Sequence, residues 1–333
     1  MVVFIILCIV ILLVVCGYVL FTQQKCWIQH TLPVNQDTSS LPLALTQLAN
    51  WPNWLPWIRY DTKADVMVKK ADSSYPYGQI TFSSQHLGTI TCSPRQPLNQ
   101  LPLSLLVASD RLFYGDLHIT IDLIDSEEGK RLRLKANNRL PFWRRYHHTQ
   151  QLNQLYADLK LMLVQLHSTF EPSQNTTLSF TALDCQTLSN MDAVTRPFIV
   201  SEQHMSQIMA MGFQDLTAIL GPENPPAGPR FALYDTADLS HHYFVGRLGI
   251  PIQCFTPCEA HPERLVFKGQ YARLKYQGSY EYLGLAWHVL KMQCLSRGLK
   301  KHPRRPSLEI FDVSPHDTNE ELQFITVLNT PIH

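Results

Sequence analysis

The chain has 333 residues, 45% of them hydrophobic, which is enough to form two domains with buried cores. Its 28 Lys and Arg residues are balanced by 27 Asp and Glu residues, and the formal net charge is +1. Because a nearly neutral chain has no overall field to concentrate it on a phosphate backbone, we expect no nucleic-acid partner.

The first predicted element is a membrane-spanning helix over residues 2–21, VVFIILCIVILLVVCGYVLF. This segment carries no charged side chain, and as a helix it is long enough to cross a hydrocarbon core of about 30 Å. A cleaved signal peptide is the alternative, but a basic leading segment and a small-residue cleavage site are missing. We therefore expect residues 1–22 to be a single-pass membrane anchor. The side of the membrane stays open, because Lys25 alone charges the near flank.

An antiparallel α+β domain is predicted for residues 23–172. A short apolar, helix-like run begins at Leu41, and Pro52 and Pro56 then forbid a continuous helix, which places the neighbouring tryptophans on a turn. Six strand-like segments follow, at residues 65–70, 78–84, 88–93, 103–109, 117–125 and 130–137. Apolar positions at helical spacing over residues 150–170 predict a long amphipathic helix that closes the sheet.

This order of elements resembles the START-like helix-grip superfamily, also called SRPBCC or polyketide cyclase-like. The motif that carries the resemblance is NWPNWLPWI, with Trp51, Trp54 and Trp57, which is similar to the W-x-x-W-x-P-W turn after the first helices of such domains. The resemblance implies a curved sheet that grips the long helix around an apolar cavity for lipids, polyketides or other hydrophobic molecules. A cavity filled by core side chains is the alternative.

Residues 173–189 are predicted to be a linker, because the segment is rich in Ser, Thr, Asn and Gln and has no sustained period. Part of it, LSFTAL, is strand-like.

No metal site is expected in the chain. Cys254 and Cys258 form the only close thiol pair outside the predicted anchor, and with a single His261 nearby they are too few for a typical zinc site. The pairs His147–His148 and His241–His242 point in different directions on any regular element.

Residues 190–333 are predicted to contain two similar units, each with the order strand, helix, strand, strand. The first unit has strands at 196–202, 228–236 and 241–251 and a helix at 204–220. The second has strands at 269–278, 307–314 and 322–332 and a helix that Ser279 caps and Gly298 ends.

This second block resembles the GyrI-like effector-binding domain, in which two pseudo-symmetric units face each other across a groove. The resemblance is carried by the G-S-Y of residues 278–280, the A-W of residues 286–287 and the E-x-aromatic of residues 309–311, in that order. It implies a groove that holds small organic molecules, often aromatic or cationic, between stacked rings over a carboxylate. Some members are ligand sensors fused to DNA-binding helices and others are hydrolases.

The resemblance also implies which residues contact the ligand. They are one acid and six aromatic residues: Glu309, Trp287, Tyr276, Tyr280, Phe311, Phe231 and Tyr234. Two of them depart from the family pattern. Phe311 stands where the family has a tyrosine, and Tyr276 stands where it has the histidine of H-x-G-x-Y. The alternatives are that Glu309 is an edge-strand charge facing water and that Trp287 only packs in the core.

The chemistry expected of such a groove is the binding of a cation. A carboxylate such as Glu309 among apolar residues resists ionisation unless it is paired, and a cation would pair with it while the rings add cation–π attraction of about 1–2 kcal/mol. We therefore expect a non-catalytic, membrane-anchored binding protein for small hydrophobic, aromatic or cationic molecules or lipids, without a cofactor. The alternatives are a hydrolase with Glu309 as general base, oriented by Tyr280 or Tyr276, and a scaffold without a ligand.

Overall fold

The structure is a computed structural model of the chain, and it divides into two compact units, Met1–Ser173 and Gln174–His333. We call these the N-terminal unit and the C-terminal unit. The residues that the structure describes are 11, 14–15, 17, 24–34, 41–111, 116–127, 129–140, 148–171, 177–201, 204–238, 243–253 and 262–333.

Several sequence predictions concern residues outside this set. The predicted membrane anchor lies outside it, apart from the helical residues Ile11, Val14, Val15 and Gly17. The segment with Cys254, Cys258 and His261, the pair His241–His242, and His147 also lie outside it. Within the described ranges, no helix is both long and apolar enough to span a bilayer.

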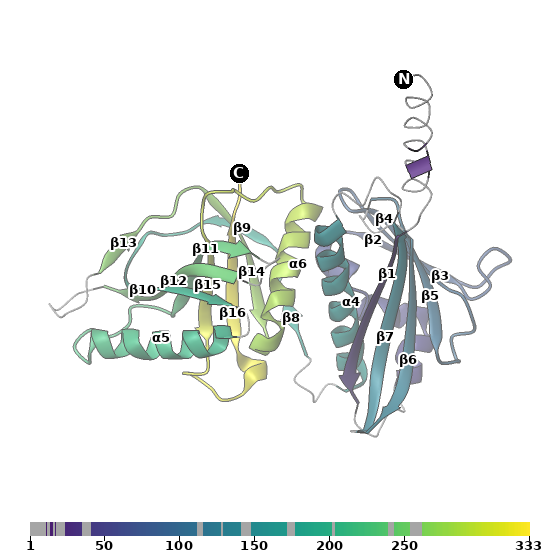
Figure 1. Cartoon of the computed structure of the whole chain (residues 1–333), viewed down its shortest axis with the longest axis horizontal. Helices are drawn as coiled ribbons and strands as arrows, with labels where there is room; N and C mark the ends of the chain where they lie inside the picture. Colours follow the sequence, from purple (N-terminus) through teal and green to yellow (C-terminus); the bar gives the residue numbers. More distant parts are fainter. Residues whose placement is uncertain are drawn as a thin grey trace, which may run out of the picture. The chain divides into compact units, whose positions relative to one another are not determined.

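The N-terminal unit contains a seven-stranded sheet in which all neighbouring strands are antiparallel (Figure 1). Its order is β1-β7-β6-β5-β4-β3-β2. The strands are β1 (Gln24–Pro33), β2 (Asp65–Lys69), β3 (Gln79–Ser84), β4 (Gly88–Pro94), β5 (Leu103–Ser109), β6 (Leu117–Ser126) and β7 (Gly129–Leu140). Strands β2 to β7 correspond to the six predicted strands, and helix α4 (His148–Phe170), which packs on β1 and β7, corresponds to the predicted long helix.

Strand β1 was not predicted from the sequence. It pairs with β7 along its whole length and closes one edge of the sheet. Its sequence, QKCWIQHTLP, has no clean apolar alternation, and Trp27 is 68% exposed. Because the position of this strand depends on a partner about 100 residues later in the chain, local periodicity does not reveal it. Tyr156 is one of the residues at helical spacing that predicted the apolar face of α4, but it is 51% exposed.

The tryptophans between β1 and β2 fill the interior of the N-terminal unit. This segment forms α2 (Leu41–Thr46), the 3₁₀ helix η1 (Leu48–Asn53) and α3 (Trp57–Tyr60). Trp51, Trp54 and Trp57 are each at most 2% exposed. The Trp51 indole N–H donates to the Leu45 carbonyl at 2.8 Å, and that of Trp54 donates to the Ala44 carbonyl at 3.3 Å. These rings are core residues whose polar atoms are satisfied locally.

The C-terminal unit contains a nine-stranded sheet with the order β13-β10-β12-β11-β15-β16-β14-β8, and β9 also pairs with β14. All its strand pairs are antiparallel. The strands are β8 (Ser179–Phe180), β9 (Asp184–Thr187), β10 (Met191–Ser201), β11 (Phe231–Asp238), β12 (Tyr243–Ile252), β13 (Glu263–Leu265), β14 (Gln270–Gln277), β15 (Ser307–Val313) and β16 (Ile325–Pro331). Strands β8 and β9 come from the segment predicted as a linker, so part of it belongs to the sheet.

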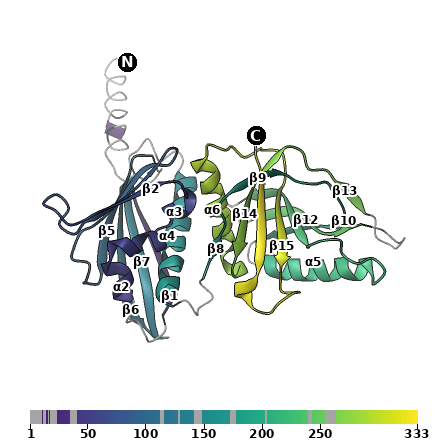
Figure 2. The ribbon, with the colours of Figure 1, turned by 180° about the vertical axis from the view of Figure 1, so that it is seen from behind.

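The two halves of this sheet repeat one order of elements, and Figure 2 labels the helix of each half, α5 and α6. The first half has β10, helix α5 (Met205–Leu220), β11 and β12, and the second has β14, helix α6 (Leu283–Ser296), β15 and β16. Across the sheet the orders are β10-β12-β11 and β14-β16-β15, and the halves join where β11 pairs with β15. Helix α5 packs on β10 and β12, and α6 packs on β14 and β16.

The loop before α6 and the end of α6 follow the predicted capping signals. Gly278 has a φ of +148°, and Ser279 accepts a hydrogen bond from the Glu281 N–H in the short 3₁₀ helix η4 (Tyr280–Tyr282) that leads into α6. At the other end, Gly298 has a φ of +67° and the Leu299 N–H returns to the Cys294 carbonyl at 2.9 Å. A left-handed glycine of this kind is a common helix stop.

Candidate functional site

The centre of the candidate site is Glu309, on the central strand β15. In the pairing register it lies opposite Ala232 on β11 and Leu328 on β16. Ala232 in turn lies opposite Leu248 on β12, a residue of the core cluster under α5. Directly opposed residues in an antiparallel sheet share a face, so Glu309 points to the helix-covered face, where it is only 2% exposed.

Two aromatic side chains hold the Glu309 carboxylate. The Tyr234 hydroxyl donates to its Oε2 at 2.7 Å, and the Trp287 indole N–H donates to its Oε1 at 2.5 Å. Tyr234 comes from β11 in the first half of the sheet and Trp287 comes from α6 in the second. The acid therefore links the two halves of the C-terminal unit. Glu309 is not an edge charge in water, and Trp287, which is half-buried, does more than pack.

The pKa of Glu309 is raised from 4.5 to about 7, because burial disfavours the charged form, and the hydrogen bonds from Trp287 and Tyr234 offset this only in part. Burial and the neighbouring carboxylate in turn hold the pKa of Tyr234 well above its usual value. Among the described residues, no Lys, Arg or His side chain forms an ion pair with Glu309. Near neutral pH, the acid is therefore divided between its two protonation states.

Aromatic rings surround this carboxylate on both sides along the sheet. The Tyr234 ring contacts Phe198 and Phe244, with centroids 5.7 and 6.1 Å apart. Two residues after Glu309, the Phe311 ring contacts Tyr280 at 5.8 Å. The Phe311 ring also contacts Phe213 of α5 at 5.9 Å, and Tyr280 contacts Phe324 at 4.9 Å. These are the edge-to-face and tilted contacts that aromatic side chains favour.

Four of the predicted ligand residues therefore lie with Glu309 in one cluster: Trp287, Tyr234, Tyr280 and Phe311. Sequence reasoning missed the other rings, Phe198, Phe213, Phe244 and Phe324, because each reaches the cluster from a different element. It also missed two hydroxyl residues on the same face, Ser307 and Thr326. Strand alternation from Glu309 could have revealed Ser307, which is two residues away.

Phe231 and Tyr276, in contrast, are not brought to the carboxylate. Phe231 is an odd number of positions from Tyr234 on β11, so its side chain lies on the opposite face, in a separate core cluster with Tyr271 and Leu308. Tyr276 is fully buried on β14, where its hydroxyl donates to the Ser279 carbonyl at 2.7 Å and its ring stacks on Phe180 at 5.6 Å. Its hydroxyl therefore stabilises the turn before α6.

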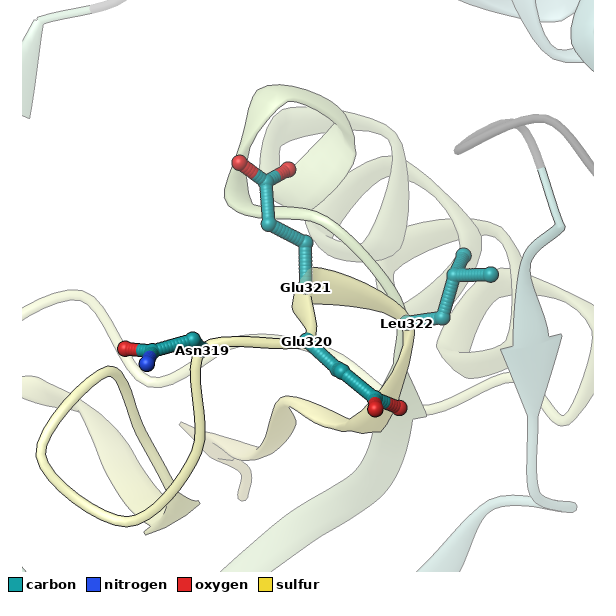
Figure 3. A pocket seen from close by; sticks show the side chains of 4 residues that line it. All are labelled: Asn319, Glu320, Glu321 and Leu322. Carbon is teal, nitrogen blue, oxygen red and sulfur yellow. The ribbon is translucent and has the colours of Figure 1, made fainter.

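An open hollow of about 330 Å³ lies beside the short 3₁₀ helix η5 (Glu321–Gln323), and Asn319, Glu320, Glu321 and Leu322 line it (Figure 3). None of the predicted ligand residues lines this hollow. The Ser279 hydroxyl donates to the Glu321 carboxylate at 2.5 Å, which ties this segment to the start of α6. We assign the hollow no role in the site at Glu309.

The solved structures that resemble this chain each cover about half of it. No protein-family model and no curated protein matches the chain. Solved structures similar to it include the EcmrR C-terminal domain, with 12% identity over 45% of this chain and 96% of that one and a TM-score of 0.38. The structure of SAV2435 bound to tetraphenylphosphonium has 12% identity over 46% of this chain and 94% of that one, with a TM-score of 0.34. The structure of a hydrolase encoded by lin2189 from Listeria innocua has 11% identity over 46% of this chain and 92% of that one, with a TM-score of 0.31. Identities of 11–12% and TM-scores below 0.5 do not assign the chain to a family.

Proposed function

We propose that the C-terminal unit is a GyrI-like module that binds small hydrophobic cations at Glu309. The observation that carries this proposal is a carboxylate that is 2% exposed, bonded to Tyr234 and Trp287, and not paired with a basic side chain among the described residues. Ionisation of such a group is unfavourable until a positive charge comes beside it. A cationic ligand supplies that charge.

The surrounding rings favour a flat or aromatic cation over a small hydrated ion. Contacts with Tyr280, Phe311 and Tyr234 offer apolar surface and negative ring faces, and each cation–π contact contributes on the order of 1 kcal/mol. Trp287 is half-buried, so it lies at the edge of the cluster, where a ligand would enter beside it. The mirrored order of strands around β11 and β15 supports the GyrI-like assignment.

The proposal is tested with two probes of equal shape and opposite charge, tetraphenylphosphonium and tetraphenylborate. We expect the full-length protein in detergent to bind the cation and not the anion at pH 8. Affinity for the cation should fall roughly thirtyfold at pH 5.5, because only a small fraction of an acid with a pKa near 7 is then ionised. Isothermal titration calorimetry measures both constants.

The matched variants are Glu309→Gln, which removes the charge at nearly constant volume, and Glu223→Gln, which alters an exposed glutamate. Glu309→Gln should weaken cation binding at pH 8 at least tenfold and remove its pH dependence, while Glu223→Gln should change neither. Equal cation affinity in wild type and Glu309→Gln would exclude the carboxylate from the site.

A hydrolase is the second candidate, because a carboxylate with a pKa near 7 is suited to act as a general base at neutral pH. This reading predicts turnover of an ester or lactone substrate that Glu309→Gln abolishes while binding is retained. Binding lost together with turnover would favour the first proposal.

The N-terminal unit we propose to be a START-like module, on the order of its elements: one strand, short helices, six antiparallel strands and a long helix. Its interior is occupied by Trp51, Trp54 and Trp57, so a lipid would need space beyond these rings.

We further propose that residues 2–21 anchor the chain in a bilayer, on their length and lack of charge. Deletion of residues 2–21 should release the protein from the membrane fraction after alkaline carbonate extraction.

A further inference from the structure

Three hydroxyl groups near Glu309 are buried without a hydrogen-bond partner among the described residues: those of Ser307, Thr326 and Tyr280. Ser307 is 6% exposed and Thr326 is fully buried. The Tyr280 and Thr326 hydroxyls lie close enough for Thr326 to act on Tyr280 as a weak hydrogen-bond partner, but the pair falls short of normal hydrogen-bond geometry, so neither hydroxyl has a well-formed bond. Buried hydroxyls without partners are uncommon in folded proteins, because desolvation is then uncompensated.

The register places these hydroxyls on both sides of the acid. Ser307 is two residues before Glu309 on the same face of β15. Phe311 is two residues after it, and Thr326 lies directly opposite Phe311 on β16. Since two residues of a strand span roughly 7 Å, Thr326 lies about that far along the sheet from the carboxylate. Tyr280 reaches the same place from η4, where its ring contacts Phe311.

We propose that the ligand of this site carries a neutral hydrogen-bonding group roughly 7 Å from its positive charge, and that this group bonds to the hydroxyls of Tyr280 and Thr326. The inference rests on the proposed binding of a cation at Glu309. It narrows the ligand class from any hydrophobic cation to a cation with an amide, carbonyl or hydroxyl substituent at the far end of an aromatic ring.

The test compares tetraphenylphosphonium with (4-carbamoylphenyl)triphenylphosphonium, which adds one amide at the end of one ring. We expect the amide to improve affinity for the wild-type protein about fivefold to tenfold, as one or two new hydrogen bonds allow. Thr326→Val keeps the shape of the side chain and should remove this advantage, while leaving the affinity for tetraphenylphosphonium unchanged. Tyr280→Phe keeps the ring that we place in the cation site and should also reduce the ratio of the two affinities. Ser307→Ala, at the opposite end of the site, should retain the advantage.

The outcomes separate the two proposals. If neither probe binds, the proposed function fails. If both bind with equal affinity, or if Thr326→Val weakens both probes alike, cation binding stands and the second anchor is overturned.

A second inference concerns strand β2, which is an unpaired edge of the N-terminal sheet among the residues that the structure describes. It pairs with β3 and ends the sheet, and all five of its residues are exposed. Val66 and Val68 lie opposite the buried residues Phe82 and Ile80 and so share the core face, yet they are 37% and 42% exposed. Met67 on the other face is 59% exposed. An edge with apolar side chains on both faces is a template for another strand.

The charges of β2 favour a second copy of the same strand. If two copies pair antiparallel about Met67, Asp65 lies opposite Lys69 of the other copy, and Val66 lies opposite Val68. Both charged pairs are then attractive, and the exposed valines cover each other. We propose that two chains associate through β2 and extend the two sheets into one, with a two-fold axis at Met67.

Light scattering coupled to size exclusion tests this on the full-length protein in detergent. We expect a dimer that Asp65→Lys or Lys69→Asp alone weakens about tenfold, since each places like charges opposite one another, and that the double variant Asp65→Lys/Lys69→Asp restores. A monomeric wild type, or a dimer that does not respond to the single charge reversals, would overturn the interface.

Discussion

The tryptophans of the two units have the same chemistry and opposite roles. In the N-terminal unit, Trp51 and Trp54 are fully buried, and their N–H groups donate to backbone carbonyls within the same segment. In the C-terminal unit, Trp287 is half-buried and donates to the carboxylate of Glu309, on another strand. A backbone carbonyl does not titrate, whereas a carboxylate with a pKa near 7 does. Of these indoles, that of Trp287 is therefore coupled to the protonation of an acid.

The largest expected effect is the loss of stability when a buried tryptophan of the N-terminal unit is removed. Trp54→Ala should lower the free energy of unfolding of the N-terminal unit by about 3–5 kcal/mol, because it leaves a large cavity in the core. Trp27→Ala is the control: Trp27 is 68% exposed in the same unit, and its loss should change stability by about 0.5 kcal/mol or less. Urea unfolding followed by hydrogen exchange in each unit measures both. A small loss for Trp54→Ala would mean that these rings do not form the core.

The next largest effect is the pH dependence that Glu309 gives to the stability of the C-terminal unit. Because the pKa of Glu309 is raised from 4.5 to about 7 by folding, its contribution to stability is complete below pH 4.5 and is lost as pH rises through 7. We expect the C-terminal unit of the wild type to lose on the order of 3 kcal/mol between these values. Glu309→Gln should remove this slope, and Glu223→Gln should retain it. A slope that persists in Glu309→Gln would assign the titration to another group.

A smaller effect is expected at the indole itself. Trp287→Phe removes the N–H and keeps a ring, so it should lower stability by about 1.5–3 kcal/mol at pH 8, where the carboxylate is ionised, and by less at pH 5. The pKa of Glu309 should rise further, because the lost hydrogen bond lowers it. Thermal unfolding across this pH range gives both quantities. An equal loss at both pH values would show that Trp287 only packs.

The smallest effect separates two of the buried tyrosines of the C-terminal sheet, Tyr276 and Tyr234. Tyr276→Phe should cost about 1 kcal/mol, for the bond to the Ser279 carbonyl, and leave tetraphenylphosphonium binding unchanged. Tyr234→Phe removes a hydrogen bond to the Glu309 carboxylate and should raise the pKa of that acid, which weakens cation binding at pH 7. Calorimetry at that pH distinguishes the two variants, and equal affinities in both would remove Tyr234 from the site.

Glu309, Trp287, Tyr234, Tyr280 and Phe311 were predicted from the resemblance to the GyrI-like domain, whose motifs are short stretches of sequence. The acid at 309 and the aromatic residue two positions later alternate on one face of a strand, and Trp287 follows from a helix that begins near Ser279. Phe231 does not lie at the site, because it is three residues from Tyr234 on the same strand and its side chain therefore lies on the other face of the sheet. Its placement with Tyr234 came from the resemblance alone. Ring contacts from Phe198 and Phe213 could not be predicted, because they depend on how distant elements pack.

The sequence by itself determined most of the strands and the long helices of both units, because hydrophobic periodicity, glycines and capping residues act over a few residues. Strands β1, β9 and β13 were not predicted. The tertiary structure alone decided the partners of Glu309. Strands β11 and β15 are joined by hydrogen bonds between segments about 75 residues apart, and this register places Tyr234 on one side of the acid while α6 places Trp287 on the other. A carboxylate has no local signal for its depth, so burial, and with it the raised pKa, appears only when the sheet and helices have packed.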